Sequence, residues 1–219
     1  MEMSEQTLGK LPQTEIIFGK LLSRLEKEAN NQGQSNQELR GQVQETRSKT
    51  HEVTYITSSA VGPGYLVREN LKTLSAPAQT DKALTRRGDI VIKLTKPFDS
   101  ALVRTPEEEN LLVTSTCAII RIDRDAGVNP AYFAGFLLRP GVRSWLLDAA
   151  GGSTLKRSAL EPLRLALPDE ETQKKLGLLH VRVVESELAQ LAAIDEGRSL
   201  RDAFYEDALK NHLAVVSTD

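Results

Sequence analysis

Cysteine, histidine and long apolar runs are scarce in this 219-residue sequence. Cys117 is the only cysteine, which excludes an internal disulfide and any zinc site built from several cysteines. No run reaches the roughly 18 consecutive apolar residues of a membrane span, and the first residues lack the apolar core of a secretion signal. We therefore expect a cytoplasmic protein that makes no use of a membrane.

Groupings of residues that carry chemistry are also scarce. His51, His180 and His212 are scattered, and none of them stands beside a nucleophile motif. The acidic pair Asp123 and Asp125 lacks the ligand spacing of a metal site, and no phosphate loop ends in Lys-Ser/Thr. The sequence therefore predicts no catalytic residue, no metal and no cofactor.

One motif favours an enzyme. Asn129-Pro130-Ala131-Tyr132 resembles the Asn-Pro-Pro-Tyr motif of amino-methyltransferases, in which the asparagine holds the target amino group. Here Ala131 replaces the second proline, and no glycine-rich turn follows an N-terminal strand to hold a cofactor. We favour a simpler interpretation, a helix that begins at Pro130, and keep a methyltransferase fragment as a rival.

Charge is unevenly distributed along the chain, whose net charge is −2. Residues 20–104 carry 14 basic and 9 acidic side chains, whereas residues 168–219 carry 6 basic and 11 acidic ones. Because DNA affinity depends on local positive potential, the basic first half permits nucleic-acid binding without demonstrating it.

Short β-rich runs separated by turns dominate the chain after a polar segment at 30–50. Residues 16–25 have helix-like apolar spacing but also suit a short strand or a mixed element, and residues 1–15 read as a polar lead-in. Strands are expected at 53–56, 65–67, 90–94, 111–113, 117–122 and 160–167. The predicted fold class is α+β: a curled mixed or antiparallel sheet with a helical insert at 130–149.

A long amphipathic helix is expected after Pro168, because Asp169, Glu170 and Glu171 suit a helix start. Gly197 is a possible interruption. One side of this helix carries an apolar stripe, which must be covered either by the protein's own sheet or by a second copy of the helix. The spacing of the apolar residues does not decide between these two partners. The members of the stripe are Leu176, Val181, Val184, Leu188, Leu191, Leu200 and Phe204.

A glycine-rich turn, residues 151–157, combines open backbone with hydroxyl and basic side chains (GGSTLKR). Such a turn can donate to phosphate oxygens, although it also suits an ordinary helix-to-strand connection.

These parts, in this order, resemble the target-recognition domain of type I restriction–modification specificity subunits. The resemblance begins at Ile17 (IIFGKLLSRLEKEA), continues at Arg86–Val103 (RRGDIVIKLTKPFDSALV) and is strongest from Val113 to Lys175. There a strand ending in Ile-Arg, a Pro-x-Tyr helix, a Gly-Ser-Thr turn and a strand ending in proline follow one another. The resemblance implies a DNA target-recognition domain at 1–167 and a helical dimerisation or spacer region at 168–219.

The chain differs from that family in size, because it has one recognition domain and one helix where a usual subunit has two of each. The resemblance therefore implies a homodimer through the 176–209 helix that reads a bipartite, symmetric site in double-stranded DNA. It also implies two partners, a modification subunit that methylates adenine and a restriction subunit, and no catalysis by this chain. A second alternative to the DNA-recognition subunit is a protein–protein adaptor with the same fold.

Candidate DNA contacts follow from position and chemistry, with long polar side chains as base readers and basic or hydroxyl groups as phosphate contacts. The candidate base readers are Gln37, Arg40, Gln44, Arg47, Lys93, Lys96 and Arg104. The candidate phosphate contacts are Lys20, Arg24, Lys49, Ser153, Thr154, Lys156 and Arg157.

Overall fold

The structure is a computed structural model that describes residues 4–23, 27, 50–77, 81–152 and 154–216. By its internal contacts the chain forms two compact units, residues 1–180 and 181–219. The second unit consists of the continuation of one helix, and the first contains every strand and all the shorter helices of the described residues.

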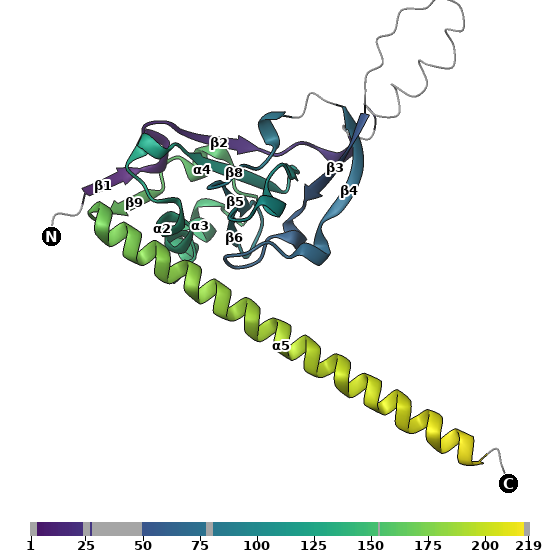
Figure 1. Ribbon diagram of the computed structural model, residues 1–219. Coiled ribbons are helices and arrows are strands. Elements are labelled where there is room, and N and C mark those ends of the chain that lie inside the picture. Colours follow the sequence, from purple (N-terminus) through teal and green to yellow (C-terminus); the bar gives the residue numbers. More distant parts are fainter. Residues whose placement is uncertain (1–3, 24–26, 28–49, 78–80, 153, 217–219) are drawn as a thin grey trace, which may run out of the picture. The chain divides into compact units, whose positions relative to one another are not determined.

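Nine strands are arranged in three sheets in the described part of the first unit (Figure 1). They are β1 (Ser4–Thr7), β2 (Thr14–Phe18), β3 (Thr50–Ile56), β4 (Lys72–Pro77), β5 (Ile90–Lys93), β6 (Ser100–Leu102), β7 (Leu112–Val113), β8 (Cys117–Ile122) and β9 (Arg164–Leu167). The sheet orders are β2-β8-β5-β6, β4-β3-β7 and β1-β9. Single 3-10 turns lie at Leu8–Lys10, Ser58–Ala60, Arg68–Asn70, Asp81–Ala83, Pro106–Glu108 and Arg124–Ala126.

The four-stranded sheet is antiparallel throughout and holds the core. β5 and β8 are its two central strands, and residues 90–92 and 117–120 are all fully buried. Continuous apolar runs of this kind are expected where both faces of a strand are covered. Residues 16–25 form a mixed element: Thr14–Phe18 (β2) pairs with Ala118–Ile122 of β8, and residues 22–23 are helical.

The two other sheets lie toward opposite ends of the first unit in Figure 1. β3 pairs antiparallel with β4 and parallel with β7, which makes this sheet mixed. β1 pairs antiparallel with β9, from Ser4 opposite Leu167 to Thr7 opposite Arg164. The expected α+β class with mixed and antiparallel sheet is therefore confirmed.

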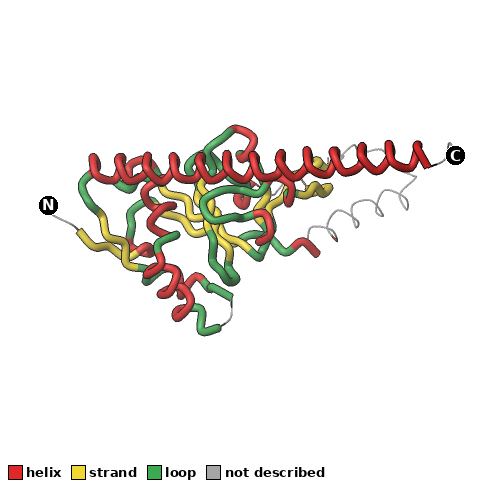
Figure 2. The backbone as a smooth tube through the Cα atoms, turned by 90° about the horizontal axis from the view of Figure 1, so that it is seen from below, coloured by secondary structure: helices red, strands yellow, loops and turns green. Residues whose placement is uncertain are grey.

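The helical insert is also confirmed, as α2 (Pro130–Leu137) and α3 (Pro140–Ala149), each with proline in its first turn. A short helix, α4 (Arg157–Leu160), follows the glycine-rich turn. The last helix, α5 (Glu170–Val216), is continuous in Figure 2, and Gly197 does not interrupt it. Among the described residues, no helix is long and apolar enough to cross a membrane.

Some expected strands were wrong. Residues 65–67 form no strand; Leu66 makes only an isolated bridge to Val61, because the Gly62–Gly64 turn reverses the chain too tightly for a ladder. The strand expected at 160–167 begins only at Arg164, since residues 157–160 are helical. Three strands were missed: β1, β4 and β6. β1 lies in the supposed lead-in, which pairs with β9 instead of remaining irregular.

Candidate nucleic-acid interface

Four segments from distant parts of the sequence meet at the end of β5 where Lys93 lies. The Lys20 backbone N–H donates to Val113 O (3.0 Å), and Lys20 O accepts from the Ser115 N–H (2.9 Å). The Leu94 N–H donates to Thr116 O (3.0 Å), and Leu94 O accepts from the Leu155 N–H (2.8 Å). Backbone hydrogen bonds thereby join four segments: the chain just after β2, the β7–β8 connection, the end of β5 and the glycine-rich turn.

We call this region the basic edge and define it by its cations: Lys20, Lys93, Lys96, Arg143, Lys156 and Arg157. Five of the six belong to the sequence-predicted set. The backbone hydrogen bonds above, and Asp99 between Lys93 and Arg143, join the segments that carry them.

The glycine-rich turn presents an open backbone at this edge. Gly151 and Gly152 have φ values of 55° and 81°, in the left-handed region that suits glycine. A Cβ built at either glycine meets no atom within 4 Å, so the turn is open to an incoming group. Leu155 is buried and anchors the turn, whereas Thr154 and Lys156 on either side of it are exposed.

Arg157 has a second role at the edge, because its side chain ties α4 to β2. Its guanidinium donates to Ile16 O, lies 5.5 Å from the centre of the Phe18 ring and is 3.9 Å from a Glu161 carboxylate oxygen. The side chain is still half exposed. It therefore keeps surface for a phosphate while its position is fixed.

Asp99 holds two cations side by side beneath the edge. Lys93 Nζ lies 3.0 Å from Asp99 Oδ2, and an Arg143 guanidinium nitrogen lies 2.5 Å from Asp99 Oδ1. Asp99 is almost fully buried, and Lys93 and Arg143 are 15% and 30% exposed. Two positive charges share one negative charge, so this cluster retains a net charge of +1.

Arg143 is the cation of this edge that the sequence did not predict. It lies in the first turns of α3, and nothing in the local pattern indicates that α3 delivers it to Asp99, 44 residues away. Lys93 was predicted as a base reader, but its ammonium faces Asp99. Lys96 is exposed in the turn that follows β5, so of these two lysines it has the freer access to a ligand.

The remaining predicted DNA contacts lie elsewhere. Arg104 follows β6, which pairs antiparallel with β5, so it lies at the opposite end of these strands from Lys93. Its backbone N–H donates to Glu108 (2.7 Å), and its charge, after burial, lowers the pKa of His180. Seven candidates lie outside the described residues: Arg24, Gln37, Arg40, Gln44, Arg47, Lys49 and Ser153.

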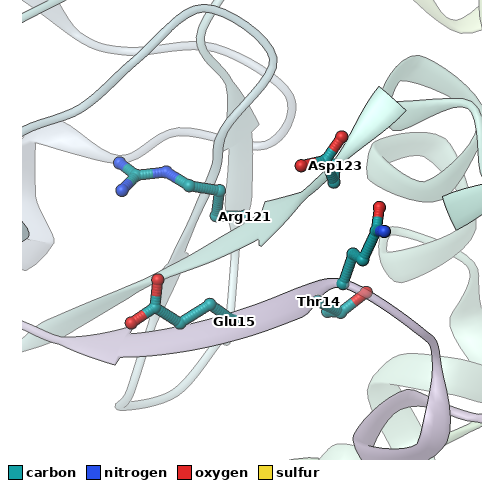
Figure 3. A pocket seen from close by; sticks show the side chains of 5 residues that line it. Thr14, Glu15, Arg121 and Asp123 are labelled. Carbon is teal, nitrogen blue, oxygen red and sulfur yellow. The ribbon is translucent and has the colours of Figure 1, made fainter. Parts of the chain in front are cut away.

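A second polar surface lies between the ends of β2 and β8 (Figure 3). It is lined by Gln13, Thr14, Glu15, Arg121 and Asp123. Arg121 is already engaged, because its guanidinium makes two hydrogen bonds to Asp89 (2.7 and 2.9 Å) and one to Leu84 O. The remaining charges here are carboxylates, which repel phosphate, so we assign no DNA contact to this pocket.

The Asn-Pro-x-Tyr motif is structural. Asn129 is the N-cap of α2, and its side-chain oxygen accepts from the Ala131 and Tyr132 N–H groups (2.9 and 3.0 Å). The Tyr132 hydroxyl donates to Ala166 O. Both side chains are occupied by backbone groups, as expected for a helix start at Pro130. Among the described residues, no group of three or more His, Cys, Asp or Glu side chains could hold a metal ion.

Cys117 is the fully buried first residue of the central strand β8, opposite Lys93, and burial raises the pKa of its thiol to about 11. We expect it to react with an aromatic disulfide at pH 8 about a hundredfold more slowly than a free cysteine, because the thiolate is the reactive form. Absorbance of the released thiolate measures the rate. The unfolded chain in denaturant is the control and should react normally; fast reaction of the folded chain would contradict this burial.

The stripe expected on α5 is exposed unevenly. Val184 is 2% exposed. Val181 and Leu188 are half-buried. The others are exposed: Leu176, Leu191, Leu200 and Phe204, with Phe204 at 77%.

Comparison with solved structures identifies the fold. No protein-family model and no curated protein matches the sequence. A chain from a structure on complex assembly and conformational transition of the type I R-M system matches with a TM-score of 0.54 and 12% identity, covering 85% of this chain and 39% of that one. The described chain has the fold of a type I restriction–modification specificity subunit.

Two further structures match with lower TM-scores. The HsdS subunit from Thermoanaerobacter tengcongensis has a TM-score of 0.49 and 12% identity, covering 85% of this chain and 38% of that one. The S subunit of a type I restriction–modification system from M. genitalium has a TM-score of 0.47 and 13% identity, covering 86% of this chain and 40% of that one. The specificity-subunit-like chain thus spans about two fifths of the length of each structure it matches.

Proposed function

We propose that this chain is a non-catalytic DNA-recognition subunit of a type I restriction–modification complex. The observation that carries the proposal is the convergence of five sequence-predicted cations, with Arg143, at one edge of a specificity-subunit-like fold. Lys96, Thr154 and Lys156 hold the phosphate backbone there, beside an open glycine turn. Such contacts fix register and orientation, and they leave base discrimination to longer polar side chains.

Residues 1–167 act as the target-recognition domain in this proposal, and residues 168–219 as the helical region that brings two copies together. Two copies related by a two-fold axis read two half-sites, so the target is bipartite and symmetric. The chain directs a partner adenine methyltransferase subunit, and a restriction subunit where one is present, to that site in the cytoplasm.

The basic edge is tested by replacing its two exposed lysines. We expect Lys96→Ala combined with Lys156→Ala to weaken binding of a fluorescein-labelled random-sequence duplex about tenfold at low salt. The slope of log affinity against log salt concentration should fall by about 2, because each lysine releases roughly one counterion on binding. Fluorescence anisotropy across a salt series measures both quantities.

The matched control is Lys174→Ala combined with Lys175→Ala, which removes the same charge from exposed lysines of α5 that pair with Glu170 and Glu171. Its salt slope should match that of the unaltered chain. An equal loss in both variants would mean that total charge, not the basic edge, determines binding.

Sequence recognition requires a separate measurement. Rounds of selection from a randomised duplex pool, followed by sequencing, should enrich two inverted half-sites at a fixed spacing. A bound fraction with no enriched sequence would remove the recognition role and favour the adaptor with the same fold.

A further inference from the structure

Two threonine hydroxyls in the β7–β8 connection form a chain of hydrogen bonds beside the basic edge. The buried Thr114 hydroxyl donates to Ile56 O at the end of β3 (2.8 Å). The Thr114 and Thr116 hydroxyl oxygens lie 3.1 Å apart, and Thr116 Oγ1 accepts from the Ser58 N–H (3.1 Å). The two side chains thus connect a backbone donor to a backbone carbonyl.

The direction of this chain follows from the number of protons. A hydroxyl has one proton to donate and two lone pairs with which to accept. Thr114 gives its proton to Ile56 O, so Thr116 is the donor between the two threonines. Within the described part of the chain, the Ser58 N–H takes one lone pair of Thr116 and leaves the other for a ligand. The 3.8 Å contact of this oxygen with Cys117 Sγ is long and weak.

Thr116 therefore presents an acceptor at the surface. The residue is exposed, whereas Thr114 is 1% exposed, so the hydrogen bonds run inward from the surface. Turning the Thr116 proton outward would take a donor away from the buried Thr114 oxygen, which costs free energy. The arrangement favours the acceptor role of Thr116.

Backbone hydrogen bonds place this acceptor next to the cations of the basic edge. Thr116 O accepts from the Leu94 N–H (3.0 Å), two residues before Lys96. The adjacent Ser115 N–H donates to Lys20 O (2.9 Å). Lysine side chains are donors without an acceptor, so Thr116 adds the opposite polarity to this surface.

We propose that Thr116 reads a base of the DNA held at the basic edge, by accepting a hydrogen bond from an exocyclic amino group. This inference rests on the proposed function and adds one short side chain to the long polar ones that discriminate bases there. Thr116 distinguishes a base edge that carries an amino group from one that carries a carbonyl group.

The chemistry of DNA explains why the partner is a base. Phosphate and deoxyribose oxygens are acceptors, so they bond to donors such as lysine and not to a lone pair. In the major groove the donors are the N6 amino group of adenine and the N4 amino group of cytosine, and in the minor groove the donor is the N2 amino group of guanine. An acceptor held at the surface therefore selects among base pairs.

Two substitutions at Thr116 separate its hydroxyl from its shape. Thr116→Val removes the acceptor at nearly constant volume, and Thr116→Ser keeps it. We expect Thr116→Val to lower the ratio of affinity for the selected duplex over a random duplex about tenfold, and Thr116→Ser to retain the ratio. The salt slope should stay unchanged in both, because a neutral side chain releases no counterion. Fluorescence anisotropy measures these quantities.

The matched control is Thr73→Val, which removes an exposed threonine hydroxyl from β4 of the three-stranded sheet. It should leave the affinity ratio unchanged. Thr116→Val also takes an acceptor from the Ser58 N–H, so circular dichroism and thermal melts of every variant establish that the chain is folded.

The amino group is tested from the side of the DNA. In the selected duplex each adenine is replaced in turn by purine, each cytosine by pyrimidin-2-one and each guanine by hypoxanthine, all of which lack the amino group. One replacement should weaken binding about tenfold more for the unaltered chain and for Thr116→Ser than for Thr116→Val, because the variant has already lost the same hydrogen bond. The base that shows this coupling identifies the groove.

Failure of this inference can be distinguished from failure of the proposed function. A selected site whose preference survives Thr116→Val, or a loss of affinity that is equal for selected and random duplexes, rejects the reading role and leaves Thr116 as a structural cap of Ser58. A chain that enriches no sequence rejects the recognition function, and the role of Thr116 with it.

Discussion

We expect Asp89→Ala to lower the free energy of unfolding by about 3–5 kcal/mol, the usual cost of removing one partner of a buried ion pair. Asp89 is 3% exposed and takes two hydrogen bonds from Arg121 and one from the Arg86 N–H (2.7 Å). An arginine guanidinium is not deprotonated in proteins, so Arg121 stays charged when the carboxylate is lost. An unpaired charge then remains between β5 and β8. Urea denaturation measures the change.

The matched control for this pair is Glu5→Ala, which breaks an exposed ion pair between Glu5 and Arg164 (3.8 Å) that also joins two strands. We expect it to cost less than about 1 kcal/mol. Comparable losses in the two variants would show that Asp89 contributes no more than a surface charge.

The second large effect is expected at Gly19, which directly precedes the first lysine of the basic edge. A Cβ at this position would lie 2.1 Å from Thr114 O and 2.5 Å from Val113 O, both backbone atoms. The Gly19 and Lys20 N–H groups donate to Cys117 O and Val113 O, so the chain cannot move away without losing them. Gly19→Ala should therefore cost about 3 kcal/mol, by overpacking a core that cannot yield.

Gly141→Ala is the control for that substitution. Gly141 lies in the first turn of α3, and a Cβ there meets no atom within 4 Å. Since alanine has the higher helix propensity, this variant should be neutral or slightly more stable. Thermal melts of both variants provide the comparison, and an unchanged melting temperature for Gly19→Ala would contradict the close approach of β2 to the β7–β8 connection.

The central strands and helix starts were predictable from the sequence because their signals are local. β8 is apolar at every position of Cys117–Ile122 except Arg121, and α2 begins at a proline behind an asparagine cap. β1, β4 and β6 were missed because their partners, not their own residues, determine them. Ser4–Thr7, for example, is wholly polar and extends only because β9 offers it a ladder.

The candidate site shows the same division. Its lysines could be proposed from charge and from the glycine turn, but their convergence depends on hydrogen bonds such as Leu155 N–H to Leu94 O, which no local pattern reveals. Arg143 was missed for this reason, and Lys93 was assigned a role without its partner Asp99.

In the proposed function, the cluster around Asp99 changes the entropic cost of binding a phosphate at the basic edge. Long cationic side chains ordinarily lose rotamer freedom when they hold a ligand. This loss of entropy opposes binding by up to about 2 kcal/mol for each side chain. Lys93 and Arg143 have already been ordered by Asp99 during folding. A phosphate that approaches them therefore meets preorganised cations, while the exposed Lys96 and Lys156 must still be ordered on binding. Asp99 therefore lowers the net charge of the basic edge and also lowers the entropic cost of binding an anion there.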